Sequence, residues 1–264
     1  MPLPVIQPEQ DKPVPKKNPQ DEEISRVRGA LTNIKYKIGV HSGKGGVGKT
    51  FVACNLAMTL AAEGYQVGLL DADVDCPNVP TFLNLHADLG MDEAGRIVPL
   101  LYKHMKVVST GFIQQEDEPL IVRGPIKHRV LTDFLELALW GPLDYLIIDF
   151  PPGTSDVPLS AMQYVDLTGV LIVSTPQKES IADATRAVHM ARKLGVPILG
   201  LIENMSGEVF GHAGEALAKK LGIAFLGSIP LSKEIRELSD RAEPAFVYPV
   251  LDTFTTGLLK NLPH

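Results

Sequence analysis

The sequence HSGKGGVGKT at residues 41–50 satisfies the pattern G-x-x-x-x-G-K-[ST] and directly follows an apolar run that is typical of a strand. This is the pattern of a phosphate-binding loop, in which glycines let backbone N–H groups wrap a polyphosphate, some of them at positive φ. We expect Lys49 to reach the β- and γ-phosphates and the Thr50 hydroxyl to hold Mg²⁺, beside the positive end of the following helix. The expected nucleotide contacts are Gly43, Lys44, Gly45, Gly46, Val47, Gly48, Lys49, Thr50 and Phe51.

A second lysine, Lys44, stands inside this loop, where an ordinary phosphate-binding loop needs no cation. The run GKGGVGKT therefore resembles the deviant Walker A loop of the ParA, MinD, Mrp and nitrogenase-iron-protein class. In that class the extra lysine reaches across an ATP-bound dimer to the partner's phosphates. The resemblance implies a dimeric nucleotide switch in which Lys44 joins Lys49 in catalysis.

The composition indicates one large α/β domain. With 264 residues, 45% of them hydrophobic and 21% charged, the chain can bury a substantial core. A net charge of -6 without a dense Lys/Arg stripe argues against nucleic acid as the main partner. The start MPLPV lacks the regions of a signal peptide, and no apolar run approaches transmembrane length. We therefore predict a cytoplasmic protein with no membrane partner.

Residues 1–24 are rich in Pro, Gln, Lys and acids, so we expect a disordered tail, either solvated or docked onto a partner. Residues 25–264 are expected to form a single P-loop ATPase domain, entered through a short helix at 24–34. Alternation of strand-like and helix-like runs predicts an α/β fold of three layers, a mostly parallel twisted sheet of about seven to eight strands with helices on both faces. The strands are expected at 37–41, 66–70, 97–102, 105–109, 143–150, 170–174, 197–202 and 224–229.

The apolar run Leu146-Ile147-Ile148-Asp149 has the pattern of a buried strand that delivers one carboxylate beside the phosphates. We expect Asp149 to orient Mg²⁺, directly or through water. Pro-Pro-Gly follows at 151–153. It predicts a second switch, in which the Gly153 N–H bonds the γ-phosphate and leaves the site after hydrolysis.

Two further carboxylates, Asp71 and Asp73, follow the expected strand at 66–70. In open parallel sheets ligands bind at this carboxyl edge. We predict that Asp71 supports Mg²⁺ through its water shell, so that the metal site consists of Thr50, Asp71 and Asp149. The alternative is a polar strand end with helix-capping Asp residues. Asp73 matches the position that, in the resembling class, orients the attacking water.

Further matches narrow the resemblance. Besides the loop, they comprise DADV at 71–74, RGP at 123–125, DFPPGT at 149–154, ENMS at 203–206 and LGSIPL at 226–231. Together these segments resemble the Mrp/ApbC iron-sulfur carrier ATPases. The resemblance implies an Mg-dependent ATP hydrolase that acts as an ATP-gated homodimeric switch in iron-sulfur cluster assembly or transfer. It also implies that Asn204 and Pro230 hold the adenine base, although Asn204 would serve equally as a turn residue.

One segment departs from this family. Its members usually place a C-x-x-C pair shortly after ENMS, and two such pairs bridge a cluster across the dimer. Here Ser206 is followed directly by GEVFGHAGE at 207–215, as if the cysteine loop had been excised. We therefore predict that this chain alone holds no stable iron-sulfur cluster, and that a protein partner in metallocofactor assembly, such as a cysteine-bearing paralogue, supplies the ligands.

The two cysteines form neither a C-x-x-C pair nor a disulfide framework. Cys54 lies on the expected helix after the loop and is predicted to be a core residue. Cys76 is open to a metal or redox role, or to none. His212, beyond the missing cysteine loop, is expected at the surface.

Two other functions fit the same loop. A MinD- or ParA-like switch would position a membrane, DNA or a large assembly, but residues 251–264 carry one lysine and no basic amphipathic face. A regulatory ATP-binding adaptor with low turnover would recruit a partner. Asp73 argues for hydrolysis without determining its rate.

Overall fold

The computed structural model describes residues 18–113, 124–154 and 156–243, together with residues 256, 257, 260 and 262. Its centre is a sheet whose strands are β1 (Ile34–His41), β2 (Val67–Asp71), β5 (Leu100–Tyr102), β6 (Met105–Val108), β7 (Leu143–Asp149), β8 (Gly169–Ser174), β9 (Ile198–Ser206) and β10 (Phe225–Pro230). The order is β10-β9-β8-β1-β7-β2-β6-β5, and every neighbouring pair is parallel except β5 with β6. This eight-stranded sheet confirms the predicted fold class.

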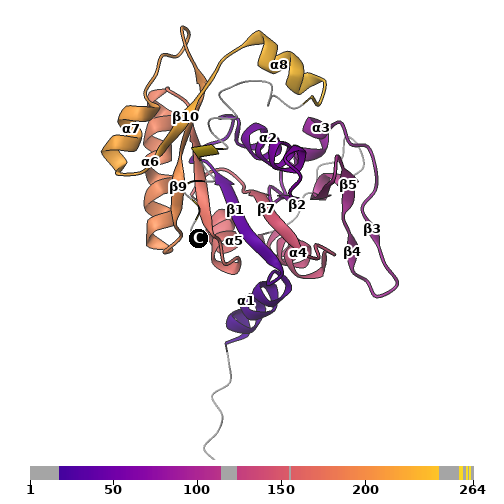
Figure 1. Cartoon of the computed structure of the whole chain (residues 1–264). Coiled ribbons are helices and arrows are strands. Elements are labelled where there is room, and N and C mark those ends of the chain that lie inside the picture. The colour runs from indigo at the N-terminus through magenta and orange to yellow at the C-terminus, as the bar shows by residue number, and fades with distance from the viewer. Residues whose placement is uncertain are drawn as a thin grey trace, which may run out of the picture.

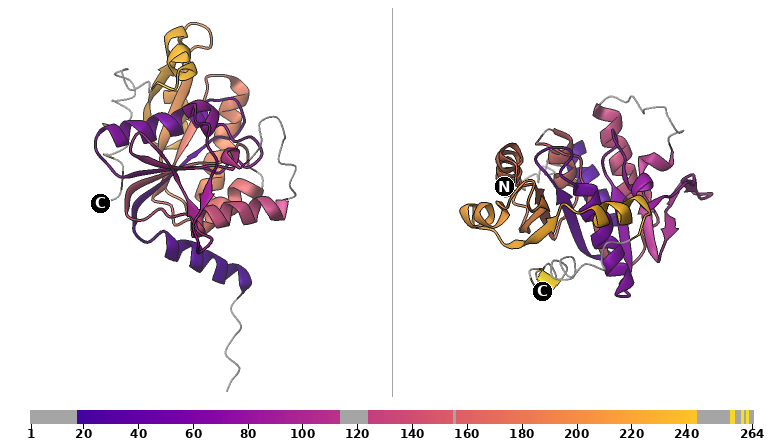
Figure 2. Two further views of the ribbon diagram at one scale, coloured as in Figure 1. Left: turned by 90° about the vertical axis from the view of Figure 1, so that its right-hand side faces the viewer. Right: turned by 90° about the horizontal axis from the view of Figure 1, so that it is seen from above.

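Helices cover both faces of the sheet (Figures 1 and 2). They are α1 (Pro19–Ala30), α2 (Lys49–Ala62), α3 (Val79–Leu83), α4 (Gly124–Leu137), α5 (Asp156–Tyr164), α6 (Lys178–Lys193), α7 (Gly214–Leu221) and α8 (Lys233–Asp240). Side chains of α2 and α3 belong to one buried cluster, whereas those of α4, α5, α6 and α7 belong to the other. The central strands therefore bury both faces, which explains why β8 is apolar almost throughout.

Alternation along β1 decides which face each of its side chains enters. Ile38 and Val40 pack in the cluster under α2. Gly39 lies on the opposite face, where a Cβ would come within 2.4 Å of the Phe150 ring. Glycine is therefore needed there for the close approach of Phe150 to the strand that leads into the glycine loop.

The N-terminal helix starts earlier than the sequence predicts. α1 begins at Pro19, inside the segment expected to be a tail, because Asn18 caps it by accepting the Gln20 N–H at 3.3 Å and proline suits the first helical position. Val27 and Leu31 anchor this helix in the core under α4 and α5. Residues 1–17 lie outside the described part, so the tail expectation stays a prediction there.

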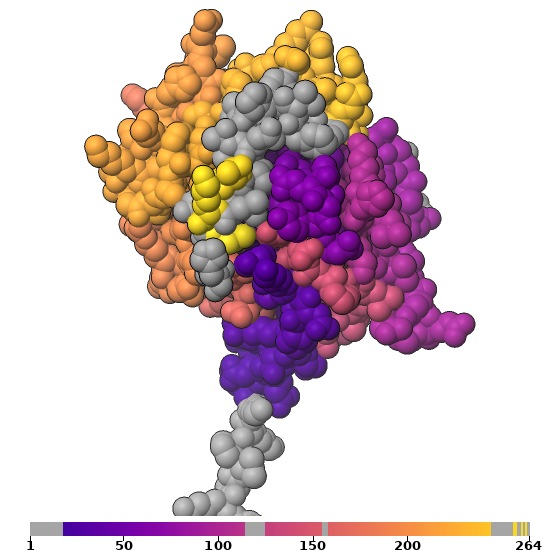
Figure 3. Space-filling view, in the orientation of Figure 1, coloured from indigo at the N-terminus to yellow at the C-terminus, as the bar shows by residue number. Residues whose placement is uncertain are grey.

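The segment expected as one strand at 97–102 is divided in two. β4 (Ile97–Val98) pairs with β3 (Gly90–Met91) in a separate hairpin, while β5 pairs antiparallel with β6 in the large sheet. The hairpin projects from the rim of the molecule (Figure 3). Within the described ranges no helix combines the length and apolar character needed to cross a membrane.

Candidate nucleotide-binding site

The glycine loop lies at the middle of the sheet, because it follows β1, which runs between β7 and β8. β7 ends at Asp149, which pairs in register with Val40 of β1 and with Asp71 of β2. Three parallel strands therefore deliver the loop and two carboxylates to one edge. This is the edge at which open α/β sheets bind ligands.

Backbone geometry in the loop requires glycine at several positions. Gly46 and Gly48 have φ values of 78° and 85°, in the left-handed region. A Cβ on Gly48 would lie 2.0 Å from the Asn204 amide nitrogen, and one on Gly43 would lie 2.1 Å from the Asp183 carbonyl oxygen of α6. The loop is thus packed tightly at Gly43 and Gly48, while Gly45, Gly46 and Gly48 line the cavity.

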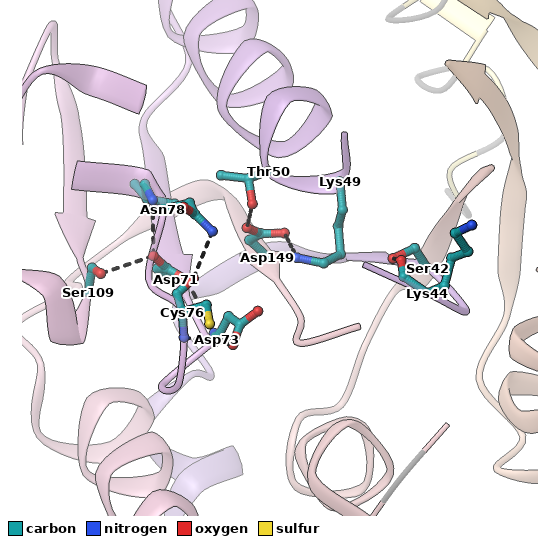
Figure 4. A network of polar contacts seen from close by, with 11 residues as sticks. Ser42, Lys44, Lys49, Thr50, Asp71, Asp73, Cys76, Asn78, Ser109 and Asp149 are labelled. Carbon is teal, nitrogen blue, oxygen red and sulfur yellow. Dashed lines mark hydrogen bonds and ion pairs between the residues drawn. The ribbon is translucent and has the colours of Figure 1, made fainter. Parts of the chain in front are cut away.

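Lys49, Thr50 and Asp149 form a compact polar cluster at the start of α2 (Figure 4). The Lys49 ammonium donates to Asp149 Oδ1 at 2.8 Å, and the Thr50 hydroxyl donates to Asp149 Oδ2 at 2.5 Å. Asp149 is fully buried and Lys49 is 7% exposed. A charge buried this deeply needs its partner, so the cation and the carboxylate hold each other beside the loop.

Asp71 binds the chain that follows β2. Its Oδ1 accepts the Asp73 N–H at 3.2 Å, and its Oδ2 accepts the Val79 N–H at 3.1 Å and the Ser109 hydroxyl at 3.0 Å. Complete burial, together with the nearby negative charge of Asp149, raises the pKa of Asp71 to about 8. Asp71 therefore anchors the loop that carries Asp73, and its role toward Mg²⁺ stays a prediction.

Asp73 lies in the wall of a cavity of about 530 Å³ beside the glycine loop. Its Oδ1 accepts the Cys76 N–H at 3.3 Å, and burial raises the pKa of its carboxyl group. The cavity is lined by Ser42, Lys44, Gly45, Gly46, Gly48, Lys49, Thr50, Asp73, Val74, Asp75, Cys76, Asn78, Lys127, Pro151 and Pro152. Segments predicted separately as loop, carboxylate and switch thus surround one space.

Lys44 lies apart from the buried cluster. Its carbonyl oxygen accepts the Ser42 hydroxyl at 2.9 Å, and Figure 4 shows its ammonium pointing away from Lys49 and Asp149. The two lysines of the loop therefore have different surroundings. Lys49 is buried against Asp149, whereas the Lys44 ammonium points away from this pair.

The segment after β7 contacts the glycine loop directly. The Gly153 N–H donates to the Ser42 carbonyl oxygen at 2.9 Å, with Gly153 at φ 92°. Pro151 and Pro152 line the cavity. In this arrangement the Gly153 N–H has a partner within the loop, so the predicted bond to a γ-phosphate would require an exchange of partners.

A second cavity, of about 380 Å³, opens on the other side of Gly48. Asn204 and Pro230, both expected at the base, line it together with Phe51, which was expected as a nucleotide contact. The Asn204 amide donates to the Val47 carbonyl oxygen at 2.9 Å, and this leaves its oxygen to act as an acceptor. The contact with adenine stays a prediction.

The connection from β9 to α7 is short and closed. Gly207 and Gly211 exchange two backbone hydrogen bonds, at 3.1 and 2.6 Å, around a tight turn. The buried Glu203 carboxylate then accepts the N–H groups of Ala213 and Gly214 at the start of α7, at 2.6 and 2.5 Å. His212 is exposed beside it, as expected.

The two cysteines occupy opposite environments. Cys54 is fully buried in the core, as predicted, and burial raises the pKa of its thiol. Cys76 is exposed and lines the cavity. Among the described residues no group of three or more His, Cys, Asp and Glu side chains has an arrangement suited to a metal ion.

Two residues near the loop were not expected from the sequence. The Lys127 ammonium of α4 lies 2.7 Å from Asp75 Oδ2 and lines the cavity opposite the glycine loop. His41, the last residue of β1, is completely buried. The contacts of Lys127 arise only when α4 packs against the sheet edge, so no local pattern predicts them. A histidine at the end of a strand likewise has no sequence pattern that indicates a role.

A glycine loop at the end of a central parallel strand, with a buried Lys-Asp pair beside it and a cavity in front, defines a P-loop nucleotide-binding protein. Comparison with known families refines this class. The family model ParA, described as NUBPL iron-transfer P-loop NTPase, matches residues 33–256, and the chain belongs to this family. The resemblance to the iron-sulfur carrier ATPases is thereby confirmed.

Related sequences carry consistent names. An iron-sulfur cluster carrier protein of Aquifex aeolicus is 44% identical over 234 residues, which are 84% of this chain and 64% of that protein. The iron-sulfur cluster transfer protein NUBPL of Dictyostelium discoideum is 44% identical over 238 residues, covering 85% of this chain and 73% of its own. The chain therefore spans just under two thirds of the Aquifex relative.

Solved structures show the same fold. A nucleotide-binding protein from Archaeoglobus fulgidus, in complex with ADP, matches with a TM-score of 0.75 and 31% identity, over 91% of this chain and 97% of that one. The cell division ATPase MinD of Pyrococcus furiosus matches with a TM-score of 0.65 and 23% identity, over 86% and 97%. The MinD likeness concerns the fold alone.

Proposed function

We propose that this chain is an Mg-dependent ATP hydrolase that acts as an ATP-gated homodimeric switch in iron-sulfur cluster assembly or transfer. The observation that carries the proposal is the grouping of Lys49, Thr50 and Asp149 at the glycine loop, with Asp73 in the wall of the same cavity. A cavity of about 530 Å³ is of the size that small-molecule sites occupy.

The residues at the loop fit Mg-ATP. Left-handed glycines turn backbone N–H groups toward a polyphosphate, and hydroxyl and carboxylate oxygens are the ligands that Mg²⁺ prefers. Thr50 would hold the ion, with Asp149 bound directly or through water and Asp71 acting through the water shell. Bound Mg²⁺ supplies neutralisation of the phosphate charge. Lys49 would exchange Asp149 for the β- and γ-phosphates of a bound nucleotide.

Asp73 would orient the attacking water. Burial raises the pKa of the Asp73 carboxyl group, which makes this carboxylate a better proton acceptor than an exposed aspartate. In-line attack on a γ-phosphate needs little beyond positioning and neutralised charge. Lys49 supplies one positive charge from within the subunit, and we propose that the partner's Lys44 supplies another, since this ammonium points away from its own Asp149.

The Gly153 segment would report the state of the nucleotide. Its N–H would leave the Ser42 carbonyl for the γ-phosphate and return after hydrolysis. Exchange of one hydrogen bond for another costs little free energy, so the γ-phosphate can decide which arrangement is populated. We infer that the dimer forms when the Gly153 N–H is on the γ-phosphate, and that it dissociates when this N–H returns to Ser42.

The names of the relatives support iron-sulfur transfer as the process. The tight turn from Gly207 to Gly211 follows Ser206 directly, where the resemblance led us to expect a C-x-x-C pair. We therefore propose that this chain supplies the ATP-driven switch, and that a cysteine-bearing paralogue or another assembly protein supplies the cluster ligands.

The experiment that tests hydrolysis measures phosphate release from Mg-ATP and, in parallel, sedimentation with ADP and with a non-hydrolysable ATP analogue. Turnover together with a dimer that forms only with the analogue is expected. A monomer under both conditions would refute the dimeric switch, and absence of phosphate release above background would refute the hydrolase.

The process is tested by comparing proteins retained by Asp73→Asn in ATP with those retained by the wild type in ADP. Retention of metallocofactor-assembly proteins only in the ATP-locked variant is expected. Retention of DNA or lipid instead would favour a positioning ATPase.

A further inference from the structure

His41 carries an unexplained pair of polar atoms. Its side chain is completely buried at the end of β1, and within the described part of the chain neither ring nitrogen has a hydrogen-bond partner. Buried polar groups are nearly always paired, because desolvation without a new hydrogen bond is costly. An apolar side chain of similar size would fill this position more stably.

The surroundings of His41 connect it to the switch segment. The ring meets the Phe150 ring edge-on, with centroids 6.5 Å apart and planes at 79°. Phe150 directly precedes Pro151, Pro152 and Gly153. The residue after His41 is Ser42, whose carbonyl oxygen holds the Gly153 N–H. His41 therefore lies between the glycine loop and the segment proposed to follow the γ-phosphate.

The His41 ring is neutral, and this determines which hydrogen bonds it can form. Burial, with the nearby Lys49 cation as a second cause, lowers the pKa of His41 to about 3. A neutral imidazole has one N–H donor and one acceptor nitrogen. Hydrogen bonding toward the backbone of Pro151 and Gly153 acts in the opposite direction and raises the pKa, so this backbone lies beside the ring, although neither ring nitrogen reaches full hydrogen-bond geometry with it.

We propose that His41 is a positioning residue for the switch segment 150–154, and that its ring completes a hydrogen bond with the backbone of this segment when the Gly153 N–H leaves Ser42 for the γ-phosphate. The inference rests on the proposed function. Its physical basis is that an unpaired buried group disfavours the arrangement with Gly153 on Ser42, so pairing of the ring in the other arrangement shifts the balance toward the ATP form.

Two variants of similar size separate this role from packing. His41→Leu removes both polar atoms, whereas His41→Gln keeps one donor group and one acceptor. We expect His41→Leu to unfold without nucleotide at the same temperature as the wild type or higher, to keep its KM for ATP within about twofold, and to lose about tenfold in kcat. His41→Gln should recover at least part of kcat. Ile172→Val, beside His41 on β8, serves as a core control that lowers stability while keeping kcat.

A second measurement does not depend on turnover. Imidazole ¹⁵N resonances of the wild type, assigned to His41 through their loss in His41→Gln, should shift between ADP and a non-hydrolysable ATP analogue. Equal kcat in His41→Leu and wild type, or ring resonances unchanged between the two nucleotides, would overturn the inference. If the wild type binds the analogue without hydrolysing ATP, the hydrolase proposal fails, while the resonances still decide the role of His41.

Discussion

The nucleotide edge of the sheet, where the glycine loop, Asp71 and Asp149 lie, has an open cavity. The connection from β9 to α7 is closed by its own hydrogen bonds. At the nucleotide edge, glycines, three lysines and two aspartates line a cavity of about 530 Å³. At the connection, backbone and carboxylate hydrogen bonds close a tight turn onto α7. The first region has groups arranged for a ligand, and the second uses its polar groups on itself.

The two regions also differ in how much of the core depends on them. The nucleotide site depends on strands that also build the core, because β1, β2 and β7 each lie inside the sheet. The connection is a surface segment, where a loop can be shortened if the chain ends remain joined. We therefore expect changes at the nucleotide edge to have large effects, and changes at the connection to have small ones.

The largest effect is expected for Lys49→Ala, which should abolish Mg-ATP binding in a titration calorimeter, because Lys49 neutralises phosphate charge within its own subunit. The variant also leaves Asp149 buried without its cation, at a cost of about 3–5 kcal/mol in stability. Lys49→Ala with Asp149→Asn is the matched control, since it should recover stability without recovering binding. Binding by either protein would contradict the assignment of Lys49.

Asp73→Asn should slow hydrolysis by about a hundredfold in single-turnover experiments, while nucleotide affinity stays within about 1 kcal/mol. The amide preserves shape but orients water poorly. Asp75→Asn, in the same loop, is the control and should hydrolyse within about threefold of the wild type, because an exposed ion pair such as Asp75 with Lys127 contributes little. Unchanged hydrolysis in Asp73→Asn would transfer the role to another residue.

Lys44→Ala should keep monomeric nucleotide binding and lose ATP-dependent dimerisation, with turnover reduced by about tenfold or more. The reason is geometric, because a shared lysine acts only when two sites face each other. Sedimentation with a non-hydrolysable analogue is the measurement. A Lys44→Ala protein that dimerises and hydrolyses like the wild type is incompatible with the proposed role.

At the connection, Glu203→Gln should reduce the free energy of unfolding by about 1–3 kcal/mol, because the carboxylate caps α7 through two N–H groups and also accepts the Ser228 hydroxyl. Denaturant unfolding measures this. Glu215→Gln, exposed on the first turn of the same helix, should change stability by less than about 0.5 kcal/mol. Equal effects of the two substitutions would show that the cap is unimportant.

The last prediction is a negative result in iron-sulfur reconstitution. Anaerobic reconstitution with iron and sulfide, followed by desalting, should leave no stable cluster, because a four-iron cluster needs about four converging thiolates and a dimer of this chain offers Cys76 twice beside a buried Cys54. Visible absorption with near-stoichiometric iron, lost in Cys76→Ser, would overturn this prediction. It would also remove the contrast between the two regions.

Patterns local in the chain predicted the fold class and the parts of the site. Two of these patterns are the spacing of the glycines with Lys49 and the apolar strand that ends at Asp149. Both depend on neighbours within a few residues, so they can be recognised in the sequence alone. Most strand positions were found for the same reason, although the strand expected at 97–102 is divided between β4 and β5. The start of α1 at Pro19 was missed because composition outweighed the cap at Asn18.

The sequence by itself determined that this chain builds a P-loop on a parallel sheet and that no C-x-x-C pair follows residues 203–206. Only the tertiary structure decided the contacts between distant segments: Gly153 on Ser42, Lys127 on Asp75, Glu203 on the start of α7, and the unpaired ring of His41 beneath the switch. The physical reason is that a polar side chain has many possible partners along a chain. Packing of the helices on the sheet selects among them, and no periodicity in the sequence encodes that choice.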